Sequence, residues 1–499
     1  MFAGPEDYWL VRFLLQRGLA LLYLLAFLVA ATQFRPLAGE DGILPLDRYV
    51  EHAEFAERPS LFYYVPSDRA IGIAAWSGVA LSAVALLAGP YWLAVWLPGW
   101  TAIPASMALW LLLWGLYLSF VNAGQLFYGY GWESMLLETG FLAVFLGAGP
   151  AGPPVVVVWL VKWVCFRNMF GAGLIKLRGD ECWRDLTAMD YHYETQPIPN
   201  PVSWFAHHLP DRFHRVEVLG NHVVELAVPF LLFAPQPYAS LGGAAIVGFQ
   251  AWLMLTGNFS WLNALTIVQA VAAFTDSVLA AAFVPVGTIT AALPAGPSAV
   301  GAAPSPLIPL QIAAVALALV VAFLSVRPVQ NMLSERQVMN TAYDPLSLVN
   351  TYGAFGSITR DRHELVIQGT TDERITEDTE WQTYEFQGKP TDVSQRPRQV
   401  APYHLRLDWQ LWFAAMRRTP RRVPWFTRFL GKLLAADEAT LALLETDPFD
   451  GDAPTYVRVE RYRYRYTTPE ERAETGDWWV RNQVNTYVPP VAVEELQRG

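Results

Sequence analysis

The chain has 499 residues, of which 53% are hydrophobic and 16% are charged, with a formal net charge of −10 at pH 7. Soluble globular chains usually carry about 25% charged residues, so the composition indicates a membrane protein. The acidic balance argues against a nucleic-acid partner, which requires a basic surface. The 20 Trp and 21 Tyr are typical of proteins with many residues at a membrane–water interface.

The first long apolar segment is 8–31. Arg12 and Arg17 precede the run LALLYLLAFLVAAT, which is also the arrangement of a secretory signal peptide. The segment is long, however, and the start of the chain contains Glu6 and Asp7. We therefore interpret 8–31 as a retained membrane helix, and a cleaved signal peptide is the alternative.

Nine segments are long and apolar enough to cross about 30 Å of hydrocarbon. The predicted spans are 8–31, 70–89, 104–121, 132–149, 154–176, 217–234, 240–257, 260–275 and 307–326. The segment 90–103 is broken by two prolines, which favours an interfacial or re-entrant piece. Nine crossings place the chain ends on opposite sides of the membrane. Arg12 and Arg17 favour a cytoplasmic N-terminus, so that the loops 34–69 and 177–216 and the C-terminal region would face outward.

Charged residues interrupt the predicted span 154–176. Lys162 and Arg167 lie deep in it, and charge inside a membrane is costly and usually has a use. Their predicted partners are three acids on other spans, Glu133, Glu138 and Glu225. A buried ion-pair network that fixes helix register is the favoured interpretation, and a proton-handling or substrate-binding site is the alternative. Lys176 and Arg178 lie at the end of the helix, where snorkelling to the interface accounts for both.

The only two cysteines are Cys165 and Cys182. A continuous helix would hold them about 25 Å apart, which is too far for a disulfide. Pairing would require the chain to fold back at Gly179.

The loop 177–216 is predicted to be structured and external. It is longer than a compact fold keeps without a use, and alternating prolines at 197, 199 and 201 impose an extended run. His192, His207 and His208 lie in this loop, but no pair has metal-ligand spacing with a third ligand behind it, so no metal is predicted.

A polar stripe follows on the next apolar segment. Glu217, Asn221 and Glu225 recur at intervals of four residues, with His222 one position off that line. Such a stripe faces other helices or a cavity and not lipid, and hydrogen bonding between helices is the favoured interpretation. Further on, N-F-S at 258–260 matches a glycosylation sequon, but membrane depth argues against its use. A helix break whose side chains cap the next helix is predicted there.

Residues 286–306 read as a flexible connector rich in Gly, Ala, Pro and Ser. The composition then becomes more charged, which divides the chain into a multi-span helical domain, 1–326, and a soluble α+β domain, 327–499. Within the second domain, alternating patterns predict strands and helical periodicity predicts helices. The predicted strands are 363–369, 380–388 and 456–466, and the predicted helices are 408–418 and 425–445.

The strand 456–466 ends in RYRYRY. A period of two places three arginines on one face and three tyrosines on the other. Packed tyrosines with solvated arginines are the favoured interpretation, and a cationic docking surface is the alternative. The predicted fold class is thus a polytopic α-helical membrane bundle of about nine spans, followed by a C-terminal α+β domain with a mostly antiparallel sheet.

Several stretches are very similar to the signature of the lipase maturation factor family. They include GAGLIKLRGDECWRDLTAMDYHYETQPIPNP, the run 333–362, APYHLRLDWQLWFAAM, GKLLAADEATLALLETDPF and WWVRNQVNTYVPP. ATQFRPLAGEDGILP and YGWESMLLETGFLAVFL also match. The resemblance therefore covers nearly the whole chain apart from 286–306.

The resemblance implies a multi-span membrane chaperone that helps exported lipases reach their active form, with the C-terminal domain on the extracytoplasmic side. It implies no catalytic residues, no cofactor and no enzyme activity. Its partners would be the lipid bilayer and a hydrolase client, in a prokaryotic plasma membrane or a eukaryotic endoplasmic reticulum membrane. The absence of a retention signal and of extra cysteines favours the prokaryotic setting. The motif positions expected to serve client binding or structure are Lys176, Arg178, Gly179, Trp183, Arg184, Asp185, His192, Tyr193, Thr195, Gln196 and Pro197.

A fainter resemblance reaches the vitamin K-dependent carboxylase group. There too a helix ends in a Gly-rich stretch with a lysine, followed shortly by a tryptophan, as Lys176 and Trp183 do here. That similarity implies an alternative function, a membrane-embedded enzyme that acts on a lipid or quinone-like molecule with Lys176 as base.

Overall fold

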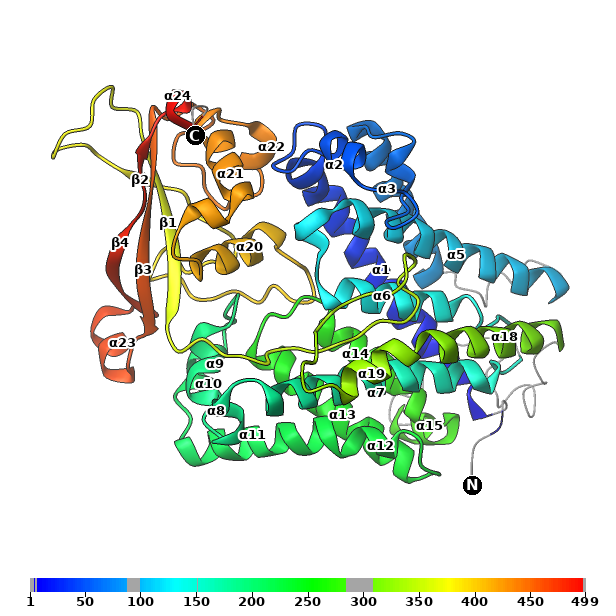
Figure 1. The fold of residues 1–499 in the computed structure, drawn as a ribbon. Helices are drawn as coiled ribbons and strands as arrows, with labels where there is room; N and C mark the ends of the chain where they lie inside the picture. Colours follow the sequence, from blue (N-terminus) through cyan, green and yellow to red (C-terminus); the bar gives the residue numbers. More distant parts are fainter. Residues whose placement is uncertain (1–3, 5–6, 88–98, 150, 284–307, 497–499) are drawn as a thin grey trace.

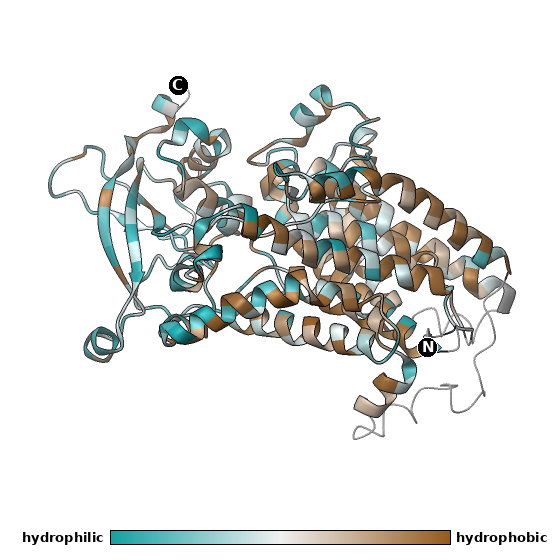
Figure 2. Cartoon of the chain, turned by 60° about the horizontal axis from the view of Figure 1, so that its bottom comes forward, coloured by the Kyte–Doolittle hydropathy of each residue, from teal (hydrophilic) through white to brown (hydrophobic). Residues whose placement is uncertain are grey.

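The computed structural model describes residues 4, 7–87, 99–149, 151–283 and 308–496 (Figure 1). In the first part of the chain, long helices form a bundle, and hydrophobic residues make up much of these helices in Figure 2. By length and composition, six helices within the described ranges could cross a membrane: Trp9–Ala38 (α1), Asp68–Leu87 (α3), Thr101–Ala123 (within α5, Gly99–Ala123), Val155–Arg178 (α7), Tyr238–Thr256 (α13) and Ile308–Leu333. The last of these combines α18 (Ile308–Leu324) and α19 (Val326–Leu333).

The expected number of nine spans is therefore too high. A seventh span results only if the pair Leu262–Ala273 and Asp276–Ala282, bent by 119°, is counted as one. This pair comprises α14 (Leu262–Ala270), a 3₁₀ turn (η4, Val271–Ala273) and α15 (Asp276–Phe283).

The other two segments make shorter helices. Segment 132–149 forms α6 (Gly131–Ala143), whose 13 residues reach only about 20 Å. Segment 217–234 forms two helices, α11 (Asp211–Leu226) and α12 (Val228–Leu231). The polar stripe makes α11 less hydrophobic than a membrane-spanning helix. Shorter helices are tolerated here because they pack against the long helices.

Contacts distinguish the two ends of the bundle. At one end the start of α1 bonds to distant chain segments, with Leu10 N donating to Asp276 Oδ1 at 2.8 Å. At the other end Gln33 of α1 donates to the carbonyl of His404 at 2.7 Å, so the C-terminal region packs there. The loops 34–69 and 177–216 lie on the side of the bundle that faces the C-terminal region in Figure 1.

Both of these loops are largely folded. The first contains the end of α1, a short helix α2 (Leu46–His52) and a 3₁₀ turn (η2, Leu61–Tyr63). The second contains α8 (Glu181–Arg184), α9 (Met189–Thr195) and α10 (Ser203–His207), which confirms that it is structured. A further 3₁₀ turn, η3 (Gln125–Tyr128), follows α5.

The C-terminal region holds a four-stranded antiparallel sheet in the order β2-β1-β3-β4. Its strands are β1 (Arg362–Thr370), β2 (Gln382–Thr383), β3 (Tyr456–Tyr466) and β4 (Trp479–Val491). Helices α20 (Arg406–Ala415), α21 (Pro424–Leu434), α22 (Glu438–Leu441), α23 (Pro469–Thr475) and α24 (Val493–Leu496), with a 3₁₀ turn (η6, Pro420–Arg422), complete it. The predicted strands 363–369 and 456–466 are confirmed.

Other predictions for this region need correction. Only two residues of 380–388 form a strand, and the helix 425–445 divides because Ala436 adopts a left-handed conformation with φ 47°. The packed interpretation of RYRYRY holds, since Tyr464 and Tyr466 are buried while Arg463 and Arg465 are exposed and paired with acids.

Three further expectations can be compared. Cys165 and Cys182 are both buried and free. The chain does break between α13 and α14, but no side chain caps α14; Asn258 instead accepts from Val400 N at 2.8 Å and Ala401 N at 2.9 Å. The connector 286–306 and most of 90–103 lie outside the described residues.

Candidate functional site

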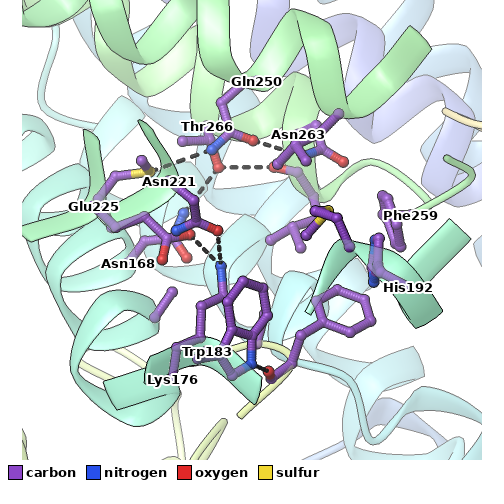
Figure 3. A pocket seen from close by; sticks show the side chains of 17 residues that line it. Asn168, Lys176, Trp183, His192, Asn221, Glu225, Gln250, Phe259, Asn263 and Thr266 are labelled. Carbon is purple, nitrogen blue, oxygen red and sulfur yellow. Dashed lines mark hydrogen bonds and ion pairs between the residues drawn. The ribbon is translucent and has the colours of Figure 1, made fainter. Parts of the chain in front are cut away.

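The amine of Lys176 is the centre of a buried polar site. Lys176 lies in the last turn of α7 and is only 5% exposed. Its Nζ donates to Glu225 Oε1 at 2.6 Å and to Asn221 Oδ1 at 2.8 Å, both on α11 (Figure 3). The expectation that Lys176 snorkels to the interface is therefore wrong. The buried ammonium is instead paired with a carboxylate and bonded to an amide oxygen, so that its charge is not left uncompensated inside the protein.

Trp183 covers this ion pair. Its ring centroid lies 4.8 Å from the Lys176 Nζ, a distance at which a cation is attracted to an aromatic face. The indole N–H donates to the Phe355 carbonyl at 2.8 Å, and the Trp183 carbonyl contacts His222 Nε2 at 3.0 Å. Asp180 caps the short helix α8 that carries Trp183, which explains why the Gly-Asp pair follows α7 directly.

The polar stripe of α11 faces the protein interior, and its residues make hydrogen bonds in two separate regions. Asn221, His222 and Glu225 surround the Lys176–Trp183 unit. Glu217 lies one turn earlier and accepts from Tyr193 Oη at 2.5 Å and from the Trp252 indole at 2.9 Å. The outward residues of the same helix, Val216, Leu219 and Val223, are exposed and apolar, as a lipid-facing side requires.

A small cavity of about 50 Å³ adjoins the amine. Amides and a hydroxyl from four helices line it beyond Lys176: Asn168, Asn221, Gln250, Asn263 and Thr266. Two hydrogen bonds link these groups, from Asn168 Nδ2 to Thr266 Oγ1 at 2.9 Å and from Asn263 Nδ2 to Gln250 Oε1 at 2.6 Å. Asn221 Nδ2 and Glu225 Oε2 are buried without a hydrogen-bond partner.

A second, larger cavity of about 590 Å³ lies beside the first. The two share Asn168, His192, Leu262, Ala354 and Phe355 as lining residues. The larger cavity is bounded by the 129–132 turn, the 352–359 segment and α20, with Trp132, Trp409, Trp412, Phe413 and Met416 among its walls. It thus lies where the C-terminal region meets the bundle.

The other motif residues are spread over these surfaces. Gly179, His192, Thr195 and Gln196 line the larger cavity. Arg178 leaves the site and donates to Met332 O at 2.8 Å and Gln337 Oε1 at 2.7 Å. Arg184 and Asp185 are exposed.

His192 is the buried imidazole between the two cavities. It packs against the rings of Phe259 and Phe355. Burial and the nearby Lys176 charge lower the pKa of His192 from 6.5 to about 4. The imidazole is therefore uncharged at neutral pH.

Comparison with known proteins gives the same family across both parts of the chain. The lipase maturation factor transmembrane domain matches residues 10–281, and the lipase maturation factor C-terminal domain matches residues 348–489. This chain belongs to the lipase maturation factor family. Lipase maturation factor 1 of Homo sapiens is 43% identical over 98% of this chain and 89% of the relative. Lipase maturation factor 1 of Mus musculus is 41% identical, over 98% and 88%. Lipase maturation factor 2 of Homo sapiens is 30% identical, over 97% and 83%. No solved structure matches.

In this family member, the loop 177–216 is bound to the C-terminal sheet by a residue that sequence reasoning missed. Arg362, at the start of β1, is fully buried and donates to the carbonyls of Glu194 and Pro197 at 3.0 and 3.3 Å and to that of Gln196. Its guanidinium also pairs with Glu364, which in turn pairs with Lys389. The sequence feature that could have indicated a buried role for Arg362 is its position directly before an apolar strand.

Two further buried ion pairs lie where the bundle meets the C-terminal region. Arg167 pairs with Glu138, as expected, and also donates to Asn350 O at 2.6 Å. Glu133 pairs with Arg406 of α20 at 2.8 Å, not with a cation of α7.

Lys162 has a different neighbour from the acids expected for it. Its amine lies 5.3 Å from the ring centroid of Trp159. Of the expected pairs, Arg167–Glu138 is the one that the described residues form, because Glu133 pairs with Arg406 and Glu225 pairs with Lys176. Within the described ranges, no group of three or more His, Cys, Asp or Glu could hold a metal ion.

Proposed function

We propose that this chain is a membrane-bound, chaperone-like maturation factor for exported lipases or related hydrolases. Family membership supports this role, since the relatives named above are lipase maturation factors. The observation that carries the proposal is the buried joint between the C-terminal region and the loop 177–216, formed by Arg362 and three backbone carbonyls. Such a joint holds the loop 177–216 against the C-terminal region, and we call the combined surface of the two the shelf. The shelf is a continuous surface to which another polypeptide can bind.

Exposed aromatic rings on the shelf, and on the loop 34–69 at the same end of the bundle, suit an immature client. Tyr64 and Phe55 lie on the loop 34–69, Phe205 lies on α10 and Phe413 lies on α20, and each side chain is at least 38% exposed. Exposed apolar groups of this kind commonly mark interaction sites. We assign to these rings the contact with apolar surface that a partly folded hydrolase still exposes.

The role we propose is non-catalytic. The charged groups of the buried site are engaged by other protein side chains. Lys176 donates to Glu225, and Glu217 accepts from Tyr193 and Trp252. None of the relatives reported above is named as a carboxylase. Structural stabilisation of the shelf accounts for these bonds.

We place the shelf on the extracytoplasmic side, in the plasma membrane of a prokaryote or the endoplasmic reticulum membrane of a eukaryote. An exported hydrolase folds after it has crossed the membrane, so its folding factor must act there. Arg12 and Arg17 near the start of α1, at the opposite end of the bundle, agree with this orientation.

Co-purification from native membranes tests the proposal. Wild-type protein should retain exported lipases or esterases in immature form, and a variant with Phe205→Asp and Phe413→Asp should retain at least tenfold less. Asn485→Ala, an exposed change on β4, is the matched control and should behave as the wild type. Recovery of mature, fully active hydrolases, or equal recovery with all three proteins, would contradict the proposal.

A further inference from the structure

The two adjoining cavities differ in size and in the charged groups beside them. The smaller one is lined by the Lys176–Glu225 pair, four amides and a threonine hydroxyl, together with apolar side chains such as those of Met169 and Phe259. The larger one is walled mainly by aromatic and aliphatic side chains. Because they share five lining residues, a single molecule could occupy both, with a polar end at Lys176 and an apolar end among the tryptophans.

Buried polar atoms without partners indicate that the smaller cavity is built to bind something. Asn221 Nδ2, a donor, and Glu225 Oε2, an acceptor, have no hydrogen-bond partner, and both side chains are at least 95% buried. Buried polar groups are nearly always satisfied in folded proteins. The missing partner must therefore both accept and donate hydrogen bonds, as a hydroxyl group does.

The charges of the site select an uncharged partner. Lys176 and Glu225 neutralise each other, and the remaining polar walls are amides and a hydroxyl. An anionic head would lie against Glu225 and a cationic head against Lys176, each without a compensating charge. His192 lies at the junction as a neutral imidazole, since burial and the Lys176 charge lower its pKa to about 4, so it supplies no positive charge either.

The size of the larger cavity suits an apolar chain. Its volume of about 590 Å³ lies within the range of about 300–1,000 Å³ that is typical of small-molecule sites. Asn168 of α7 and Leu262 of α14 continue its wall into the bundle. A polypeptide that entered this far would need partners for its backbone groups, whereas a hydrocarbon chain needs none.

We infer that the joined cavities bind a neutral single-chain amphiphile with a hydroxylated head, of the monoacylglycerol type, its head at Asn221 and Glu225 and its chain against Trp409 and Trp412. Phe413 lines this site as well as the client contact proposed above, but binding of the amphiphile does not depend on that function, and its test uses no client.

Equilibrium binding of radiolabelled 1-oleoylglycerol to the full chain, in nanodiscs of phosphatidylcholine, tests the inference. We expect saturable binding of one molecule per chain. Oleate, whose head is charged, and methyl oleate, whose head cannot donate, should each compete at least tenfold less well than unlabelled 1-oleoylglycerol. Equal competition by the three compounds would show that the site does not select the head group, and binding that does not saturate would show that there is no defined site; either result would overturn the inference.

Variants locate the site. Ala354→Trp should block the junction, because Ala354 lines both cavities, and should abolish saturable binding. Asn221→Leu should weaken binding at least tenfold by removing the donor, and Asn485→Ala should leave it unchanged. Wild-type affinity in Ala354→Trp or in Asn221→Leu would overturn the assignment. The competition experiment uses wild-type protein alone and therefore decides the question even if a variant does not fold.

Discussion

Removal of the Arg362 guanidinium should release the loop 177–216 from the C-terminal sheet. Arg362→Ala leaves three carbonyls without their donor and leaves Glu364 with Lys389 as its only ion-pair partner. Loss of one member of a buried ion pair costs about 3–5 kcal/mol. A domain is stable by only about 5–15 kcal/mol in total, so this single change removes a large part of the stability of the joint.

Hydrogen exchange of the full chain measures this effect. The free energy of local opening at 194–197 and along β1 should fall by about 3 kcal/mol or more, which corresponds to roughly 100-fold faster exchange. The control is Arg463→Ala on the neighbouring strand β3. Arg463 also pairs with an acid, Asp361, but the two side chains are 62% and 44% exposed. An exposed pair contributes at most about 1 kcal/mol. Equal exchange in the two variants would refute the view that burial of the Arg362 cluster holds the shelf together.

Three other changes have defined outcomes. Gly179→Ala should destabilise the chain, because its Cβ would lie 2.1 Å from the backbone oxygen of Gly356. Gly220→Ala on α11 is the control: its Cβ meets no atom within 4 Å, so the change should be neutral or stabilising by up to about 1 kcal/mol. Thermal unfolding compares the two variants, and equal melting temperatures would contradict the packing at Gly179. Acid should weaken the fold through His192, whose native pKa of about 4 lies below the ordinary 6.5: the unfolded chain takes up the proton first, so stability is complete above pH 6.5 and falls by up to about 3 kcal/mol toward pH 4. His192→Gln should lose less stability than the wild type between pH 7 and pH 4.5, and parallel pH profiles of the two proteins would contradict this. Non-reducing electrophoresis of wild type and Cys165→Ser/Cys182→Ser should show identical mobility, since both thiols are free, and a shift seen only in the wild type would reveal a disulfide.

Local periodicity predicted much of the fold. The long apolar helices and the strands β1 and β3 were predicted correctly, because the spacing of hydrophobic residues in these segments fits only one type of secondary structure. The inward direction of Asn221 and Glu225 also followed, because a polar stripe on an apolar helix avoids lipid. The similarity to lipase maturation factors came from longer motifs and extended over both parts of the chain.

Long-range pairing limited the rest. The segment 132–149 reads as a span by composition, but its helix ends at Ala143 and packs inside the bundle. Lys176 was assigned to the interface because its partners lie 45 and 49 residues away on α11. Arg362 and Arg406 were missed because each acts on groups more than 160 residues away, a relation that no local pattern contains.

The ratio of enzyme activity to enzyme mass in secreted lipase tests the central claim most directly. Cells that lack this chain should make a normal amount of lipase, whether secreted or retained, but its specific activity should be low. Wild-type protein should restore normal specific activity, and the Arg362→Ala variant should not. Unchanged specific activity in cells without the chain would contradict a role in lipase maturation.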